Sequence, residues 1–193
     1  MKNTDEQIIR EICEGNTRRF GLLVDRHKHR AFTLALRLVG ERREAEELVQ
    51  DAFIRAFHHL GDFRNEAGFG TWLYRILYNI CMTRVTRRKG APQLLDIQDE
   101  KLSETIPANP DELSIQDRLE QEEVQSLLAA EIENLPEHFR AAITLFYVQE
   151  LKYEQIAEVM EVPVGTVKTY LFRGRNLLRE RMSARMSKEV HAA

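Results

Sequence analysis

Long apolar runs, cysteines, prolines and glycines are all scarce in this chain of 193 residues, and each scarcity argues against a class of protein. No apolar stretch approaches the roughly 20 residues that cross a bilayer, so we expect no membrane insertion. The charged, amphipathic N-terminus also lacks the apolar core of a signal peptide, which predicts a cytoplasmic protein. Cys13 and Cys81 are isolated thiols without CxxC spacing, so we expect neither a disulfide nor a metal site.

Helix-breaking residues are few, with five prolines and nine glycines, and they leave long segments of polar and apolar periodicity. The sequence therefore predicts an all-α fold of two small helical domains joined by a flexible linker. The boundaries that we expect are 1–89 for the first domain, 90–112 for an acidic linker with three prolines, and 113–193 for the second domain.

The first domain is expected to hold four helices. Thr4 and Gln7 form a capping-box pair that opens a short helix. Three longer helices with apolar stripes are predicted over Thr17–Val39, Glu41–Leu60 and Thr71–Lys89, and Gly40 ends the first of them.

Charge is segregated along the chain, although the net charge is only −3. From Thr71 to Gly90 there are five basic residues and no acidic ones, and from Ala91 to Leu135 there are twelve acidic residues and two basic ones. From Pro163 to Lys188 there are seven basic residues and one acidic residue. Because nucleic acid is bound through local patches, the two basic blocks are candidate nucleic-acid surfaces.

Residues 153–179 are typical of a helix-turn-helix, in which the second helix enters the major groove of DNA. Val167 and Leu171 fall about one turn apart on the buried face of the second helix, and Pro163 suits its first position. The turn position that most often holds glycine is Glu161 here. An ordinary helical hairpin with a solvated basic face is the alternative.

The segment 63–89 interleaves aromatic and basic side chains, a pattern typical of surfaces that hold unpaired bases. Trp72 fits a core position better than a base-binding one. Asn79 and the loop residues 64–66 are better candidates, because amide and charged groups can read the edge of a flipped-out base. We expect the two aromatic residues of this loop, Phe63 and Phe69, to be exposed.

The polar face of the Glu41–Leu60 helix carries one apolar residue, Ile54, among Glu47, Gln50 and Asp51. A single exposed isoleucine usually has no function. Beside these polar groups it is a candidate anchor for a protein partner.

The sequence contains no catalytic set, no glycine-rich phosphate loop and no metal-binding motif. We therefore expect a protein that is not an enzyme and that uses no cofactor, no metal and no small-molecule substrate.

Two segments resemble the extracytoplasmic-function (ECF) sigma factors, the smallest sigma subunits of bacterial RNA polymerase: AEELVQDAFIRAFHHLGDFRNEAGFGTWLYRILYN at 45–79, and LPEHFRAAITLFYVQELKYEQIAEVMEVPVGTVKTYLFRGRNLLRERM at 135–182. The motifs occur in the family's order, and the resemblance covers almost the whole chain. It implies that the first domain is sigma domain 2 and the second is sigma domain 4. The implied function is to direct core polymerase to promoters by recognising the −35 and −10 elements and promoting strand opening.

The resemblance also implies three sets of site residues. The set for the β′ clamp helices of core polymerase is Glu47, Gln50, Asp51 and Ile54. The set for the −10 element is Phe63, Arg64, Asn65, Glu66, Arg75, Tyr78, Asn79, Arg84, Arg87 and Arg88. The set for the −35 element is Lys168, Thr169, Phe172 and Arg173 at base edges, with Tyr153, Thr166, Arg175 and Arg179 at phosphates. Promoter DNA, the β flap and an anti-sigma factor are the further partners that the family implies.

Two other functions remain open at the level of sequence. A stand-alone helix-turn-helix regulator would use residues 163–179 and leave the 63–89 block without a role. A pure interaction protein that mimics a sigma factor would leave both basic blocks without one.

Overall fold

The computed structural model describes residues 4–64, 67–89 and 127–190, and all regular structure within them is helical. The elements are α1 (Asp5–Cys13), the 3-10 turn η1 (Thr17–Arg19), α2 (Phe20–Val39), α3 (Arg42–His58), the 3-10 turn η2 (Leu60–Asp62), α4 (Phe69–Lys89), α6 (Glu137–Ile143), the π-helical turn η3 (Thr144–Val148), α7 (Tyr153–Met160) and α8 (Val164–Val190). A helical stretch over 127–133 precedes α6. The all-α prediction is confirmed, and the predicted linker 90–112 lies outside the described residues.

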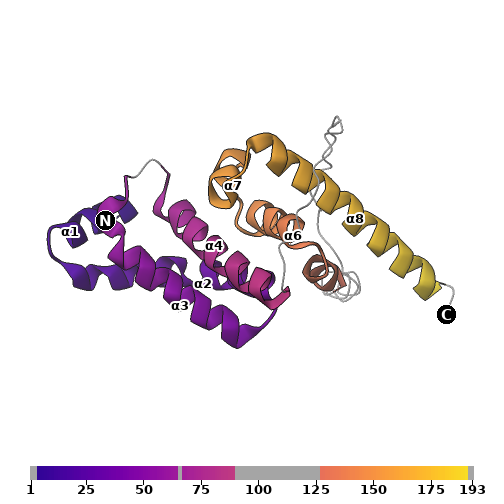
Figure 1. The fold of residues 1–193 in the computed structure, drawn as a ribbon, viewed down its shortest axis with the longest axis horizontal. Helices are drawn as coiled ribbons and strands as arrows, with labels where there is room; N and C mark the ends of the chain where they lie inside the picture. The colour runs from indigo at the N-terminus through magenta and orange to yellow at the C-terminus, as the bar shows by residue number, and fades with distance from the viewer. Residues whose placement is uncertain (1–3, 65–66, 90–126, 191–193) are drawn as a thin grey trace, which may run out of the picture.

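Two groups of helices, α1–α4 and α6–α8, lie next to each other in Figure 1. In the first group α2, α3 and α4 all contact one another, and α1 packs on α2. In the second, α8 packs against both α6 and α7. Fully buried aliphatic side chains form the core of each group: Ile8, Leu23, Leu34, Leu38, Leu73 and Leu77 in the first, and Leu145, Ile156, Val159 and Leu171 in the second. Within the described ranges no helix is long and apolar enough to cross a membrane.

The predicted start of the first helix and the predicted end of α2 are confirmed, whereas α4 begins at Phe69, two residues before the predicted Thr71. The Thr4 side chain accepts from the Gln7 backbone N–H, while Gln7 accepts from that of Thr4, and α1 begins at Asp5. Gly40 ends α2 with a φ of 76°, a left-handed conformation that glycine adopts without strain. The Glu41 carboxylate then caps the first backbone N–H groups of α3.

Asp5 joins α1 to α2. Its carboxylate lies 2.7 Å from the Arg26 guanidinium and 2.7 Å from Nε2 of His27. Burial acts to raise the pKa of Asp5, but the hydrogen bonds and positive charge of Arg26 and His27 outweigh it and hold that pKa below its usual value. The ring of His27 also packs edge-on against Phe69, so His27 links α2 to the start of α4.

The expectation that both loop aromatics are exposed is wrong. Phe69 is only 2% exposed, and Phe63 is half-buried. Their rings and that of Trp72 form one cluster, with centroids 5.1–6.1 Å apart. Trp72 is partly buried here, as the core interpretation predicted. The error arises because the loop contributes to the aromatic core as it enters α4, and sequence periodicity does not report on loops.

The turn between α7 and α8 is made by a non-glycine residue in a glycine conformation. Glu161 has a φ of 56° and caps the end of α7 through its backbone N–H. Pro163 stands one residue before α8, whose first backbone bonds run to its carbonyl oxygen. Gly174 allows α8 to approach α6, because a Cβ there would meet Cγ1 of Ile143 at 3.1 Å.

The two cysteines should differ sharply in reactivity. Cys81 is buried and burial raises the pKa of its thiol to about 12, whereas Cys13 is exposed. Because the thiolate is the reactive form, a disulfide reagent at pH 8 should modify one thiol in the folded protein and two in urea. A Cys13→Ser variant should show no fast-reacting thiol, and any fast-reacting thiol in that variant would contradict the burial of Cys81.

Candidate nucleic-acid interface

A polar groove between α3 and α4 gathers part of the set predicted for the −10 element. Its volume is about 690 Å³. The groove is lined from α4 by Asn79, Arg75, Arg84 and Arg87, and from α3 by Asp51 and Arg55. An amide that can read a base edge therefore lies beside three guanidinium groups that can bind phosphate.

Asn79 is exposed on this groove, and its side chain makes no hydrogen bond within the described part of the chain. The Thr83 hydroxyl, one turn further on, bonds back to the Asn79 carbonyl oxygen at 2.8 Å. Asp51 and Arg55 form a two-pronged ion pair across the groove wall at 2.8 and 3.2 Å. The amide of Asn79 is thus an uncharged hydrogen-bonding group that this groove presents to a ligand.

Two arginines of the set predicted for the −10 element are held by Glu44. The carboxylate lies 3.4 Å from Arg84 and 3.1 Å from Arg88, and its side chain is only 14% exposed. Arg88 also donates to the carbonyl oxygen of Val39 at the end of α2. Sequence reasoning missed Glu44, which joins the start of α3 to the end of α4 and partly neutralises both cations.

The rest of the set for the −10 element lies in different settings. Arg64 is exposed, Phe63 belongs to the aromatic cluster, and Asn65 and Glu66 lie outside the described residues. Tyr78 is only 5% exposed and points away from the groove, toward His138, with its hydroxyl 3.4 Å from Nδ1. Burial raises the pKa of Tyr78 above its ordinary value, and burial lowers the pKa of His138, which favours a neutral ring that can accept this hydrogen bond.

The residues predicted for the −35 element lie along α8, with Tyr153 at the start of α7. Lys168 is exposed near the N-terminal end of α8. Thr169, Phe172 and Arg173 line a hollow of about 320 Å³ beside α6. Further along, the Arg175 guanidinium donates to the Leu171 carbonyl oxygen, and that of Arg179 lies 3.4 Å from the Asn176 side chain. Tyr153 packs against Phe146, and Thr166 is half-buried.

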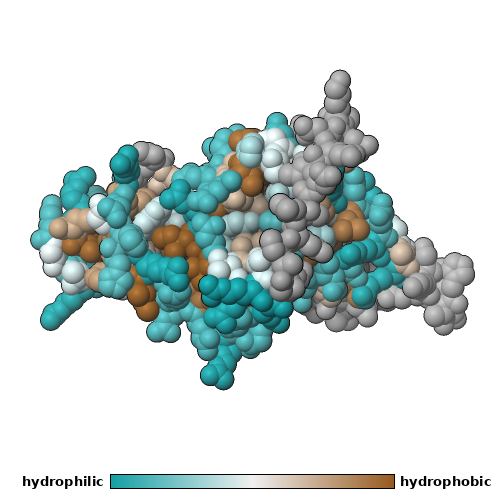
Figure 2. Space-filling model, viewed as in Figure 1, coloured by the Kyte–Doolittle hydropathy of each residue, from teal (hydrophilic) through white to brown (hydrophobic). Residues whose placement is uncertain are grey.

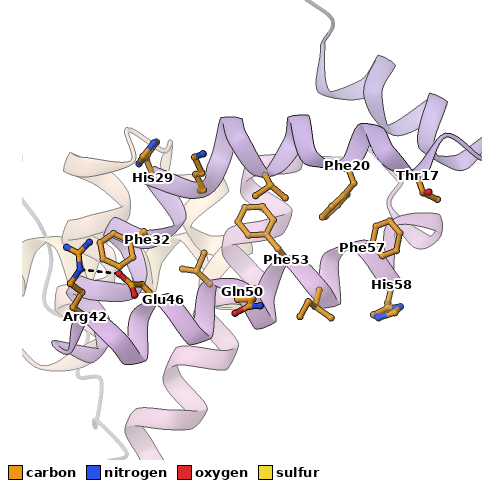
Figure 3. Close-up of a pocket in the computed structure, with 14 residues that line it drawn as sticks. Thr17, Phe20, His29, Phe32, Arg42, Glu46, Gln50, Phe53, Phe57 and His58 are labelled. Atoms are coloured by element: carbon orange, nitrogen blue, oxygen red, sulfur yellow. Dashed lines mark ion pairs between the residues drawn. The ribbon is translucent and has the colours of Figure 1, made fainter.

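A second groove, between α2 and α3, is apolar and has a volume of about 840 Å³. Figure 3 shows four phenylalanines along it, with the Arg42–Glu46 ion pair at one end. Ile54 is 48% exposed and lines it together with Gln50. Glu47 and Asp51 lie on the same helix, paired with Arg43 and Arg55.

The phenylalanines of this groove were missed as site residues. They are Phe20, Phe32, Phe53 and Phe57. The apolar stripe of α3 assigned Phe57 to the core, yet it is 37% exposed. Brown patches among the teal surface over α1–α4 in Figure 2 show that this part of the molecule keeps apolar area accessible. Exposed apolar area with a polar rim is typical of a protein-binding site.

No group of three or more histidine, cysteine, aspartate or glutamate side chains in the described ranges could hold a metal ion.

Known proteins resemble this chain over most of its length. Family models for sigma-70 region 2 and sigma-70 region 4 match residues 23–90 and 125–178. The chain is 36% identical over 176 residues to the RNA polymerase sigma-H factor of Pseudomonas aeruginosa, which covers 90% of this chain and 91% of that protein. It is 34% identical over 183 residues to the ECF RNA polymerase sigma-E factor of Escherichia coli strain K12, covering 91% and 92%.

Solved structures show the same fold. CnrH, in complex with the cytosolic domain of CnrY, matches with a TM-score of 0.65 and 25% identity over 94% of this chain and 99% of that chain. The sigma factor RpoE of Bartonella quintana, in complex with the anti-sigma factor NepR, matches with a TM-score of 0.59 and 24% identity over 83% and 94%.

The helix-turn-helix of one domain and the groove of the other that carries Asn79 and three arginines are two candidate DNA-binding surfaces. The two family models, and the 36% and 34% identity to known sigma factors over about nine-tenths of the sequence, show that the chain belongs to the ECF group of RNA polymerase sigma factors. It is a transcription initiation factor that directs RNA polymerase to promoters.

Proposed function

We propose that the groove between α3 and α4 captures an unpaired base of the −10 element and that α8 reads the −35 element as duplex. The observation that carries this assignment is the clustering of Asn79 with Arg75, Arg84 and Arg87 on one groove. The amide selects the base and the guanidinium groups bind the backbone around it. In this proposal α8 places Lys168, Thr169, Phe172 and Arg173 at base edges. The phosphates are contacted by Thr166, Arg175 and Arg179 of α8 and by Tyr153 of α7.

The other members of the set for the −10 element surround this groove in the proposal. The loop that holds the flipped base consists of Phe63, Arg64, Asn65 and Glu66, and Arg88 extends the basic surface of the groove. Tyr78 becomes part of this DNA-binding surface once its contact with the second domain is released. We place the domain boundaries at 1–89, 90–112 and 113–193. The protein acts by binding in the cytoplasm, without covalent chemistry.

Strand opening by this chain needs the polymerase. Extruding and unpairing a base costs a few kcal/mol. Stacking and pocket contacts return about 1–3 kcal/mol per base, which leaves little surplus for the free chain. Two of the cations of this site also share Glu44, which weakens their attraction for phosphate. Tight promoter binding is therefore a property of the complex with core polymerase.

The apolar groove between α2 and α3 is the proposed core-polymerase site. Ile54 and Gln50 line it, and Glu47 and Asp51 flank it on α3. The β′ clamp helices would cover the exposed apolar surface, and the β flap would contact the second domain. The complex of Bartonella quintana RpoE with NepR supports an anti-sigma factor as a further partner.

Replacing Ile54 by aspartate should lower the affinity for core polymerase at least tenfold. Full burial of such a side chain contributes about 1.5–3 kcal/mol, and the variant would place a charge in its position. The measurement is a titration of labelled sigma with core polymerase. Leu22→Asp is the matched control, because Leu22 is 39% exposed on α2 but does not line the groove. Equal losses in the two variants would contradict the assignment.

The overall proposal is tested by run-off transcription with core polymerase and a library of promoters. The chain should co-purify with core polymerase, and the complex should initiate transcription at a subset of the promoters that shares a −35 and a −10 sequence element. A stand-alone helix-turn-helix regulator would instead bind duplex DNA as a dimer without polymerase. Failure both to bind core polymerase and to direct initiation would exclude the proposed mechanism, in which one domain binds the −10 element and the other binds the −35 element.

A further inference from the structure

The first helix of the chain supports both ends of the loop between α3 and α4. In Figure 1, α1 lies at the same end of the first domain as η2 and the start of α4. α1 contacts η2, which ends one residue before Phe63, and it packs on α2, whose His27 contacts Phe69 at the start of α4. The two ends of the loop that is proposed to hold the flipped base are therefore both linked to α1.

The link at the second end of the loop runs through the imidazole of His27. Its Nε2 lies 2.7 Å from Oδ2 of Asp5, the first residue of α1. Its ring packs edge-on against that of Phe69 with centroids 5.2 Å apart, and a Cβ at Gly70 would meet its Cε1 at 3.3 Å. The imidazole thus lies between the start of α1 and the first turn of α4, in contact with both.

Asp5 fixes the hydrogen-bonding state of this imidazole. Although burial acts to raise the pKa of Asp5, Arg26 and His27 hold it below its usual value, so the carboxylate is ionised near neutral pH. An ionised carboxylate only accepts hydrogen bonds, so Nε2 of His27 carries the hydrogen and donates it. Because Arg26 donates to the other carboxylate oxygen at 2.7 Å, Asp5 is held in place and sets the orientation of the His27 ring.

Residues at both ends of the loop also line the groove that is proposed to capture the −10 base. Asp62 lines it from the end of η2, and Trp72 lines it from the first turn of α4. The indole of Trp72 packs on the buried ring of Phe69, with centroids 5.9 Å apart. Since His27 supports Phe69 from the other side, a change at His27 is transmitted to an aromatic wall on which an unpaired base can stack.

We propose that Asp5 and His27 are positioning residues for the capture of the −10 base. Their contact sets the place of Phe69, and Phe69 sets the place of Trp72 at the wall of the groove. The inference rests on the proposed function of this groove. It gives α1 a part in promoter selectivity, although none of the residues that we assign to DNA lies on α1.

The position of the indole can be measured directly, because Trp72 is the single tryptophan of the chain. Acrylamide quenching of the fluorescence of the free chain reports how accessible this ring is. His27→Leu keeps an apolar side chain but removes the N–H, and it should raise the quenching constant about twofold as the first turn of α4 loosens. His27→Gln can still donate an amide N–H to Asp5 and should stay closer to the wild type. If leucine protects Trp72 as well as glutamine does, the hydrogen bond does not position the ring.

Transcription by the holoenzyme tests the consequence for the promoter. Asp5→Asn keeps the shape of the side chain, but its single acceptor oxygen cannot accept from both Arg26 and His27. The preference for the cognate −10 element over its single-base variants should fall about fivefold, the loss expected from one hydrogen bond, while affinity for core polymerase should not change. Glu6→Gln is the matched control, because it makes the same change at the next residue, which is exposed in the first turn of α1.

Equal −10 preferences of the Asp5→Asn and Glu6→Gln holoenzymes, at a temperature where both chains are folded, would overturn the positioning role. So would a loss of core affinity with the −10 preference unchanged, since that pattern describes a contact that only stabilises the domain. If the wild-type holoenzyme itself shows no preference among −10 sequences, base capture by the groove is what fails. The quenching of Trp72 then still decides whether the contact between Asp5 and His27 places the indole.

Discussion

Replacing Gly174 by valine should destabilise the second domain by about 2 kcal/mol, within the range of about 1–3 kcal/mol that overpacking of a core typically costs. A Cβ at this position would lie 3.1 Å from Cγ1 of Ile143 and 3.4 Å from Cβ of Phe139, both on α6. Valine adds two further methyl groups to this contact. Chemical denaturation of the full chain measures the change as a lower transition midpoint for the second domain.

Gly165→Val is the matched control, since it makes the same change in the same helix. A Cβ at Gly165 meets nothing within 4 Å. Valine there should be neutral or slightly stabilising, because glycine is the poorer helix former. Equal stabilities of the two variants would show that α8 does not pack on α6 as described.

The Gly174→Val substitution should also weaken promoter recognition. Gly174 lies on α8 only one residue from Arg173, and the contact with α6 sets how far the helix stands from its domain. Because base contacts depend on sub-ångström placement, Gly174→Val holoenzyme should discriminate −35 sequences poorly even at temperatures where the domain is folded.

Replacing Asn79 by alanine should reduce run-off transcription from a cognate promoter by about 10- to 100-fold. This corresponds to the roughly 1–3 kcal/mol that one mismatched or unread base typically costs. The loss should be confined to one position of the −10 element, because an amide selects a base, and affinity for core polymerase should not change. Promoter variants at each position of that element, assayed with the mutant holoenzyme, measure this pattern.

Arg87→Ala provides the contrasting control within the same groove. Its cation would bind backbone, so its loss should weaken binding at all sequences alike and reduce the slope of log affinity against log salt by about 1. Thr83→Ala, which removes a hydroxyl already bonded to the Asn79 carbonyl oxygen, should have little effect. If Asn79→Ala behaves like Arg87→Ala, Asn79 does not read a base.

Much of the local structure could be predicted from the sequence. The capping pair of Thr4 and Gln7, the end of α2 at Gly40 and the exposure of Ile54 are all as expected. Each depends on residues within about one turn of one another. Capping, turn conformation and the apolar stripe of a single helix are local properties, so periodicity and residue type suffice to predict them.

The surroundings of α4 could not be predicted in this way. Apolar residues are spread around this helix because α2 and α3 cover one side and α7 covers another. Periodicity along one helix cannot show that Glu44 pairs with Arg84 and Arg88, or that Tyr78 turns from the groove toward His138. Those pairings join segments far apart in the sequence, and they depend on which helices become neighbours.

By itself the sequence determined the helices, their ends, the helix-turn-helix and the resemblance to ECF sigma factors. It did so because capping, periodicity and motif spacing are short-range in the chain. Only the tertiary structure decided which of the expected site residues share a groove, which apolar residues remain exposed in another, and how the two domains meet. Those features depend on packing between segments that are distant in the sequence. Burial of apolar side chains and hydrogen bonds between those segments stabilise the contacts that the chain makes.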